Sequence, residues 1–234
     1  MIKIGYCASG QEMDYHTSLA HHPAFHPVRE ELPVRGKATK CPAFAEYCQS
    51  AFNIHVPYDL RFRVKKAANG DQSFVEFDRS FTTSMGDFAF HNGISIEDID
   101  DGVLQLSMHP FFMFISDDPN VSVTVLSAQG QLNPEPIRGQ FNIYNWFRGT
   151  GYAFKATYDT WYTITKDSPI YQVKFYHPTE TNFVVSECIK TPFIMSRETG
   201  QHLHGLIGKQ KWSQIFDFNK NRRPKKVLQF LDEQ

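Results

Sequence analysis

The chain has 234 residues, with 24 Lys and Arg against 25 Asp and Glu, and its 21 phenylalanines stand out. This length and an aromatic fraction of 15% exclude a disordered chain, a collagen-like repeat and a coiled coil. A chain of this size buries enough surface to fold without a disulfide or a structural metal. Its four cysteines are scattered too widely for a disulfide framework, which favours a reducing compartment.

The first fifty residues are predicted to form a strand at 2–7, an irregular arm at 9–40 and a helix at 41–52. Three prolines prevent a long helix in the arm. From residue 41 to 52 apolar side chains recur with helical spacing, and Pro42 suits the first turn. We expect Cys41 and Cys48 on the apolar face of this helix to be buried small hydrophobic residues.

From residue 54 onward the hydrophobic period changes to two. Every second residue between 56 and 64 is apolar, which predicts a half-buried strand at 54–65, and Asn69-Gly70 predicts a turn into a hairpin partner at 73–79. Further strands are expected at 103–108, 111–116, 121–127, 151–158, 160–165, 170–176 and 182–188. Many short strands with short turns favour an antiparallel β-sandwich or jelly-roll-like fold, a double-stranded β-helix included.

The C-terminal part is basic. Residues 209–226 hold seven Lys or Arg and a single acid, and Val227, Leu228 and Leu231 have helical spacing after Pro224. We therefore expect one β-rich domain, 1–208, followed by a basic helical arm, 209–234. The arm either docks on an anionic partner or packs on the acidic remainder of its own chain. Its candidate partner-binding residues are Arg222, Arg223, Lys225 and Lys226, and nucleic acid is a candidate partner.

An aromatic cluster surrounds a single arginine at residues 139–149. An Arg148 guanidinium stacked between Trp146 and Tyr144 would clamp a planar anionic or sugar-like ligand. In the alternative interpretation, Trp146 and Phe147 cap the core and Arg148 pairs with an acid. Both interpretations remain open from the sequence.

Histidines offer the candidate metal ligands. His202 and His204, at i and i+2, would share one face of a strand, as in cupin-like sites for iron or another divalent metal, with His177 as a distant third ligand. The carboxylate expected a few residues later is missing. A second cluster comprises His16, His21, His22 and His26, beside Asp14, without the paired spacing typical of zinc ligands.

Common catalytic signatures are missing from the sequence. There is no Gly-x-Ser-x-Gly elbow, phosphate-binding loop or dinucleotide fingerprint. Carboxylates for glycoside hydrolysis remain a hypothesis, and their acidic run is alternatively a solvated loop. These residues are Asp87, Glu97, Asp98, Asp100 and Asp101.

Four short segments resemble uncharacterised proteins of tailed bacteriophages, marine ones especially. They are Lys40-Cys41-Pro42-Ala43-Phe44, Pro57-Tyr58-Asp59-Leu60, the stretch from Gly139-Gln140-Phe141 to Trp146-Phe147-Arg148, and Lys166-Asp167-Ser168-Pro169 leading into Lys174-Phe175. The resemblance spans about residues 40–178. It implies a viral or bacterial source and a β-rich fold, and no activity.

These observations favour a phage-type binding, structural or assembly protein without catalytic activity or cofactor. We expect a protein partner or self-association. The first residues lack a secretory signal and no apolar run reaches membrane-spanning length, so host cytoplasm or the virion is the expected location. The alternative hypothesis is a cupin-like, metal-dependent enzyme of the non-haem iron type that uses His202 and His204.

Overall fold

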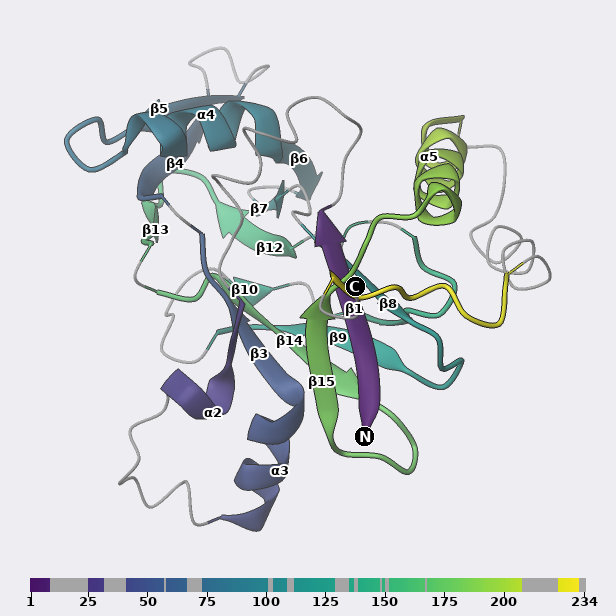
Figure 1. Ribbon diagram of the computed structural model, residues 1–234. Helices are drawn as coiled ribbons and strands as arrows, with labels where there is room; N and C mark the ends of the chain where they lie inside the picture. Colours follow the sequence, from purple (N-terminus) through teal and green to yellow (C-terminus); the bar gives the residue numbers. More distant parts are fainter. Residues whose placement is uncertain are drawn as a thin grey trace.

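The computed structural model describes residues 1–8, 25–31, 41–56, 58–66, 73–100, 103–108, 112–128, 135–136, 139–147, 149, 152–166, 168–207 and 223–231. Within these ranges the protein is mainly β, with helices placed around the sheets (Figure 1). No helix among these residues is long and apolar enough to cross a membrane.

The strands are β1 (Ile2–Ala8), β2 (Phe25–Pro27), β3 (Ala51–Ile54), β4 (Leu60–Lys66), β5 (Ser73–Phe77), β6 (Ile94–Asp100), β7 (Val103–Met108), β8 (Phe112–Ser116), β9 (Ser122–Leu126), β10 (Glu135–Pro136), β11 (Gly139–Asn142), β12 (Tyr152–Thr157), β13 (Tyr162–Ile164), β14 (Tyr171–Tyr176) and β15 (Phe183–Glu187). The helices are α2 (Val28–Glu31), α3 (Pro42–Ser50), α4 (Ser84–Gly93) and α5 (Pro192–Ile207). Every strand predicted from residue 103 onward is present.

Two of the sheets face each other across an aromatic core. One has the order β15-β1-β8 and the other β11-β9-β14-β3-β2. The ring of Phe175 on β14 lies 5.3 Å from Phe114 on β8 and 5.7 Å from Phe52 on β3, with edge-to-face geometry. This confirms the predicted phenylalanine-rich, sandwich-like packing. Among the described strands, pairing is antiparallel except between β1 and β15, which run parallel; the jelly-roll topology itself stays a prediction.

The two other sheets, β13-β4-β5 and β10-β12-β7-β6, extend the same core. The alternation predicted for β4 is confirmed, since Leu60, Phe62 and Val64 are fully buried. The Phe62 ring lies 4.9 Å from Phe90 of α4, which closes this end of the core. On the outer face of β4, the guanidinium of Arg63 lies 4.7 Å from the Trp161 ring.

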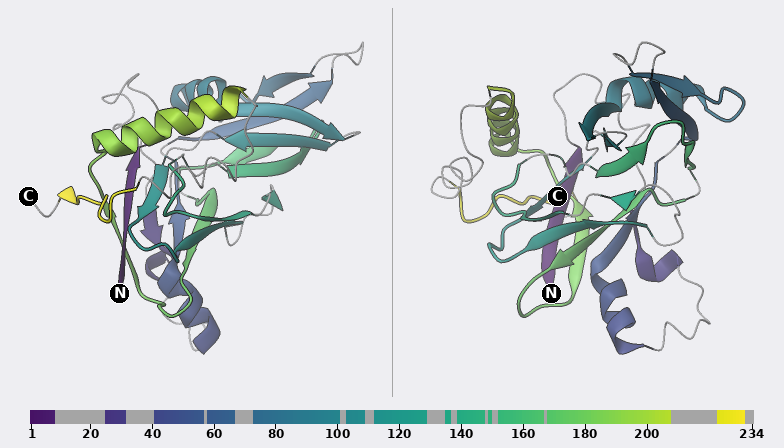
Figure 2. Two further views of the ribbon diagram at one scale, coloured as in Figure 1. Left: turned by 90° about the vertical axis from the view of Figure 1, so that its right-hand side faces the viewer. Right: turned by 180° about the vertical axis from the view of Figure 1, so that it is seen from behind.

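Strand β1 has a hydrophobic cluster on each of its faces. Ile2 and Ile4 belong to the main core, whereas Cys7 packs in a second cluster. That second cluster is covered by α5 and by residues 223–231, an extended segment that we call the strap (Figure 2). Leu228 of the strap crosses so close to Gly5 that a Cβ there would lie 2.4 Å from Leu228 Cδ2. Only glycine fits beneath the strap at this point.

Several elements differ from the sequence-based expectations in the N-terminal half. The predicted helix 41–52 ends at Ser50, because residues 51–54 pair with β14 as β3, so Phe52 lies on a strand. Cys48 is buried as expected, but Cys41 is exposed at the helix N-cap. The predicted arm contains β2 and α2 at residues 25–31, and its other residues lie outside the described ranges. The predicted strand 54–65 is divided between β3 and β4.

Three corrections concern later elements. The acidic run after Gly93 is not a loop, because residues 94–100 form β6 beside β7. The sequence pattern also does not predict α4 or α5. The described end of the expected C-terminal helix is extended: Phe230 forms an antiparallel bridge with Cys188, so contact with β1 and β15 overrides helical spacing.

Candidate functional site

The strap is held by a buried ion pair between distant parts of the chain. Asp117, at the end of β8, accepts a hydrogen bond of 2.7 Å from Arg223 Nη2 through its Oδ1 atom. The same carboxylate accepts backbone N–H bonds from Val227 at 2.9 Å and Leu228 at 3.1 Å. The Arg223 side chain has no solvent exposure. Burial lowers its pKa, and the neighbouring Asp117 opposes that shift.

Aromatic rings complete this anchor. The Arg223 guanidinium lies 4.1 Å from the ring centroid of Tyr144 and 5.3 Å from that of Phe147. It also donates hydrogen bonds to the carbonyl oxygens of Tyr144 and Ser116. An arginine is stacked at this cluster, but it is Arg223, from 79 residues further along the chain, and the stacking predicted for Arg148 stays a prediction. We call Arg223, Asp117 and Tyr144 the strap anchor.

The other predicted partner-binding residues have different positions. Trp146 is half-buried with its ring 5.0 Å from Phe141, and Phe147 is buried, as the core-capping interpretation expects. Lys225 and Lys226 are exposed on the strap. Arg148 and Arg222 lie outside the described residues. Arg223, one of the basic residues proposed for partner contact, therefore bonds within the protein's own interior instead.

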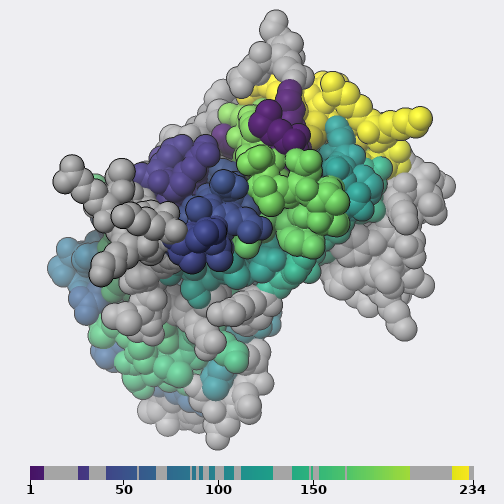
Figure 3. Space-filling model, turned by 90° about the horizontal axis from the view of Figure 1, so that it is seen from below, coloured from purple at the N-terminus to yellow at the C-terminus, as the bar shows by residue number. Residues whose placement is uncertain are grey.

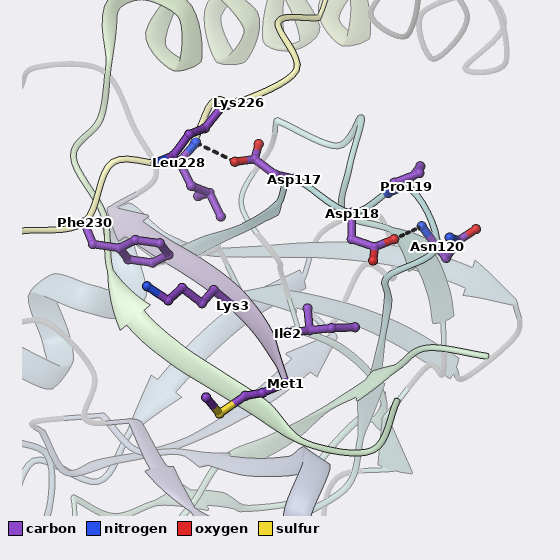
Figure 4. A pocket seen from close by; sticks show the side chains of 10 residues that line it. All are labelled: Met1, Ile2, Lys3, Asp117, Asp118, Pro119, Asn120, Lys226, Leu228 and Phe230. Carbon is purple, nitrogen blue, oxygen red and sulfur yellow. Dashed lines mark hydrogen bonds between the residues drawn. The ribbon is translucent and has the colours of Figure 1, made fainter. Parts of the chain in front are cut away.

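Beside the anchor lies an open pocket of about 560 Å³, which we call the strap pocket. Its lining comes from the start of β1, the turn after β8 and the strap (Figure 4). Seen from below, the N-terminal residues and the strap meet on the same face of the molecule (Figure 3). Leu228 and Phe230 supply apolar surface, and the ammonium group of Lys3 lies 5.3 Å from the Phe230 ring.

The carboxylates of the strap pocket are occupied by internal partners. Asp117 holds the strap, as described above. Asp118 accepts a 2.8 Å hydrogen bond from the Asn120 N–H, and its Oδ2 lies 3.4 Å from His177 Nε2. Lys226, in contrast, is exposed at the rim and forms no ion pair within the described part of the chain. The available charge at this pocket is therefore positive.

The histidines proposed as metal ligands occupy unrelated structural roles. His177 Nδ1 accepts backbone N–H bonds from Thr179 at 3.2 Å and Glu180 at 3.1 Å, which fixes the loop before β15. His202 and His204 belong to helix α5 rather than a strand. A helix therefore takes the place of the strand on which the cupin comparison was based. Among the described residues, no three His, Cys, Asp or Glu side chains are arranged to hold a metal ion.

A polar layer that the sequence did not reveal lies between helices α2 and α3 and the outer face of β3 and β14. Tyr47 donates to Gln172, Gln172 Nε2 donates to Asn53 Oδ1 at 2.7 Å, and Asn53 donates to Glu31. Glu31 Oε1 in turn lies 2.8 Å from His55 Nε2. Desolvation raises the pKa of Tyr47 at one end of this chain of bonds.

The histidine end of the polar layer contains a second imidazole. The ring of His26, on β2, lies 5.4 Å from His55 at nearly a right angle. A carboxylate bound to an imidazole fixes its tautomer, as in acid–base pairs. Within the described ranges, however, no hydroxyl or thiol donates to His55. The layer therefore acts in these residues as the polar attachment of α2 and α3 to the sheet. Of the predicted histidine cluster, only His26 falls within the described residues.

Comparison with protein-family models, with curated proteins and with solved structures finds no match to this chain. The functional argument therefore rests on the geometry of the strap, its anchor and its pocket.

Proposed function

We propose that this chain is a binding or assembly protein, and that the strap pocket takes an extended acidic segment of a protein partner. The observation that supports the proposal is that the negative charges of the pocket have partners within the protein, whereas a positive charge is available. Both lining aspartates are bound to groups of the same chain, while Lys226 is available at the rim.

An extended peptide fits this pocket better than a nucleic acid. Leu228 and Phe230 offer apolar contacts beside the lysines, which favours a segment that alternates carboxylates with apolar side chains. Nonspecific binding of single-stranded nucleic acid relies on stacking platforms in a strongly basic groove. Here the strap arginine and Tyr144 are already stacked on each other.

The test is binding of a fluorescein-labelled dodecapeptide in which Glu alternates with Leu, followed by anisotropy at low and physiological salt. Lys226→Glu should weaken binding about tenfold, the scale of one charge-assisted hydrogen bond. Lys225→Glu is the matched control, because it makes the same charge change at the adjacent exposed residue, which does not line the pocket. It should change affinity less than about twofold.

Three outcomes would overturn the proposal. One is an equal loss in the two variants, which would mean that only the overall charge of the strap matters. Another is stronger binding of a single-stranded oligonucleotide of the same net charge. The last is a protein that stays monomeric in light scattering and binds neither peptide nor oligonucleotide.

A further inference from the structure

Two cysteines lie side by side beneath the strap. Register in the parallel pair β1–β15 places Tyr6 opposite Glu187, and the Cys188 N–H donates to the Tyr6 carbonyl at 2.9 Å. Cys7 and Cys188 are therefore the next residues in this register, one on β1 and the other directly after β15. Both are buried and free, and their thiol groups share a hydrogen bond.

The geometry of this pair suits a disulfide. Directly neighbouring positions on adjacent strands are about 5 Å apart, within the Cα separation that a disulfide requires. Their sulfur atoms occupy the same side of β1, toward the strap. A Cβ at Gly5 would lie 2.7 Å from Cys188 Sγ, on the face that Cys7 shares two residues later.

We propose that Cys7 and Cys188 are an oxidisable dithiol site that the strap shields, and that small-molecule disulfides convert them into one disulfide when the strap opens. In the reaction both S–H bonds break and one S–S bond forms. The two electrons and two protons pass to the disulfide reagent, which is reduced to two thiols. The site is separate from the peptide-binding role proposed for the strap pocket.

The strap explains why the pair is reduced at rest. Leu228 and Phe230 belong to the same buried hydrophobic cluster as both cysteines, and Phe230 bridges to the Cys188 backbone. The hydrogen bond to Cys188, followed by burial, raises the pKa of the Cys7 thiol, so the reactive thiolate is suppressed.

An ion pair near the two cysteines also affects the pKa of the Cys7 thiol. Lys190, two residues after Cys188, forms a 2.5 Å ion pair with Glu198 of α5. The field of Lys190 lowers the pKa of Cys7 and that of Glu198 raises it, and both effects are smaller than those above. Admission of water when the strap detaches would remove the burial effect and so favour the thiolate that attacks the reagent.

The test uses the full chain with Cys41→Ser, because Cys41 is the exposed thiol and would otherwise react first. The reduced protein is incubated with oxidised glutathione and digested without reduction, and cross-linked peptides are identified by mass spectrometry. The expected product joins the peptides of Cys7 and Cys188, with loss of two hydrogens, and reverts with dithiothreitol. Asp117→Asn should accelerate its formation about ten- to a hundredfold, because it weakens the charged hydrogen bonds that hold the strap.

Asn53→Ala is the matched control, since it loosens the polar layer on another part of the molecule. It should leave the rate of Cys7–Cys188 cross-linking within about twofold, while increasing modification of Cys48, a buried residue of α3 that packs against Val28 and Ala51. Equal acceleration of cross-linking by both variants would show global unfolding and overturn shielding by the strap. Glutathione adducts without a Cys7–Cys188 cross-link, or no reaction in Asp117→Asn, would overturn the dithiol site.

Discussion

The strap anchor and the polar layer both bury polar groups, but with different chemistry. At the anchor, the buried guanidinium of Arg223 has one charged partner, Asp117, beside two backbone carbonyl oxygens. In the polar layer, the neutral amides of Asn53 and Gln172 pass hydrogen bonds between two helices and the sheet. A buried charge without its partner is far more costly than a buried amide without one. Loss of one residue of the anchor should therefore lower the stability of the protein strongly. Loss of one residue of the polar layer should lower it less.

The largest effect is expected from Asp117→Ala. Removing the carboxylate leaves Arg223 charged and buried, and two strap N–H groups lose their acceptor. The free energy of unfolding should fall by about 3–5 kcal/mol, measured by guanidinium titration. Asp118→Ala, at the adjacent position, is the control and should cost less than about 1 kcal/mol. Similar losses in the two variants would contradict the assignment of Asp117 as the anchor.

A smaller effect is expected from Asn53→Ala in the polar layer. The change leaves Gln172 and Glu31 without the amide that joins them, so stability should fall by about 2–3 kcal/mol. A double-mutant cycle with Gln172→Ala should show that the two losses are not additive. Strict additivity would mean that the hydrogen bonds of the layer act independently.

Gly5→Ala tests how closely the strap crosses β1. The new methyl group would overlap Leu228 and Cys188, and relieving that overlap should cost about 1–3 kcal/mol. Gly139→Ala is the control, because a Cβ there meets no atom within 4 Å. Thermal unfolding of both variants gives the comparison, and an unchanged midpoint for Gly5→Ala would show that the strap does not press on β1.

The smallest effect concerns an exposed carboxylate on the outer face of β4 and β5. Hydrogen bonds from Arg63 and then Lys65 lower the pKa of Glu76 to about 2 from 4.5. Its contribution to stability is therefore fully present above about pH 4.5 and lost as the pH falls toward 2. Glu76→Gln should flatten the pH dependence of the unfolding midpoint in that interval, whereas Glu97→Gln should leave it unchanged.

Local pattern predicted the strands well because their burial alternates along the chain. Residues 103–108 and the inward set on β4 follow directly from the period of two. Helical spacing was less reliable at residue 52 and in residues 227–231. Residue 52 pairs with strand β14 instead, and Phe230 forms a bridge with Cys188. The local pattern does not encode these long-range contacts.

The site was only partly visible in the sequence. Tyr144 and Arg223 were both candidates, but their stacking depends on a fold that joins residues 79 positions apart. Asp117 stands in a run of turn-forming residues, Asp117-Asp118-Pro119-Asn120, and its partner follows 106 residues later. Likewise, His55 fell on the polar side of an alternating strand, and its partner Glu31 lies in a proline-rich stretch without a regular pattern. Sequence separation, rather than residue type, hid these contacts.

Strand β1 pairs with strands that are far from it in the sequence, and this affects folding during synthesis. Its two neighbours, β8 and β15, come much later in the sequence, at residues 112–116 and 183–187. During synthesis, the apolar residues of β1 therefore stay unpaired until β8 and β15 have been made. Such long-range pairing is slow and leaves an unpaired edge exposed to aggregation. The strap follows later still in the sequence, so the contact of Leu228 with Gly5 is expected to form after the strand pairs of β1 have become possible.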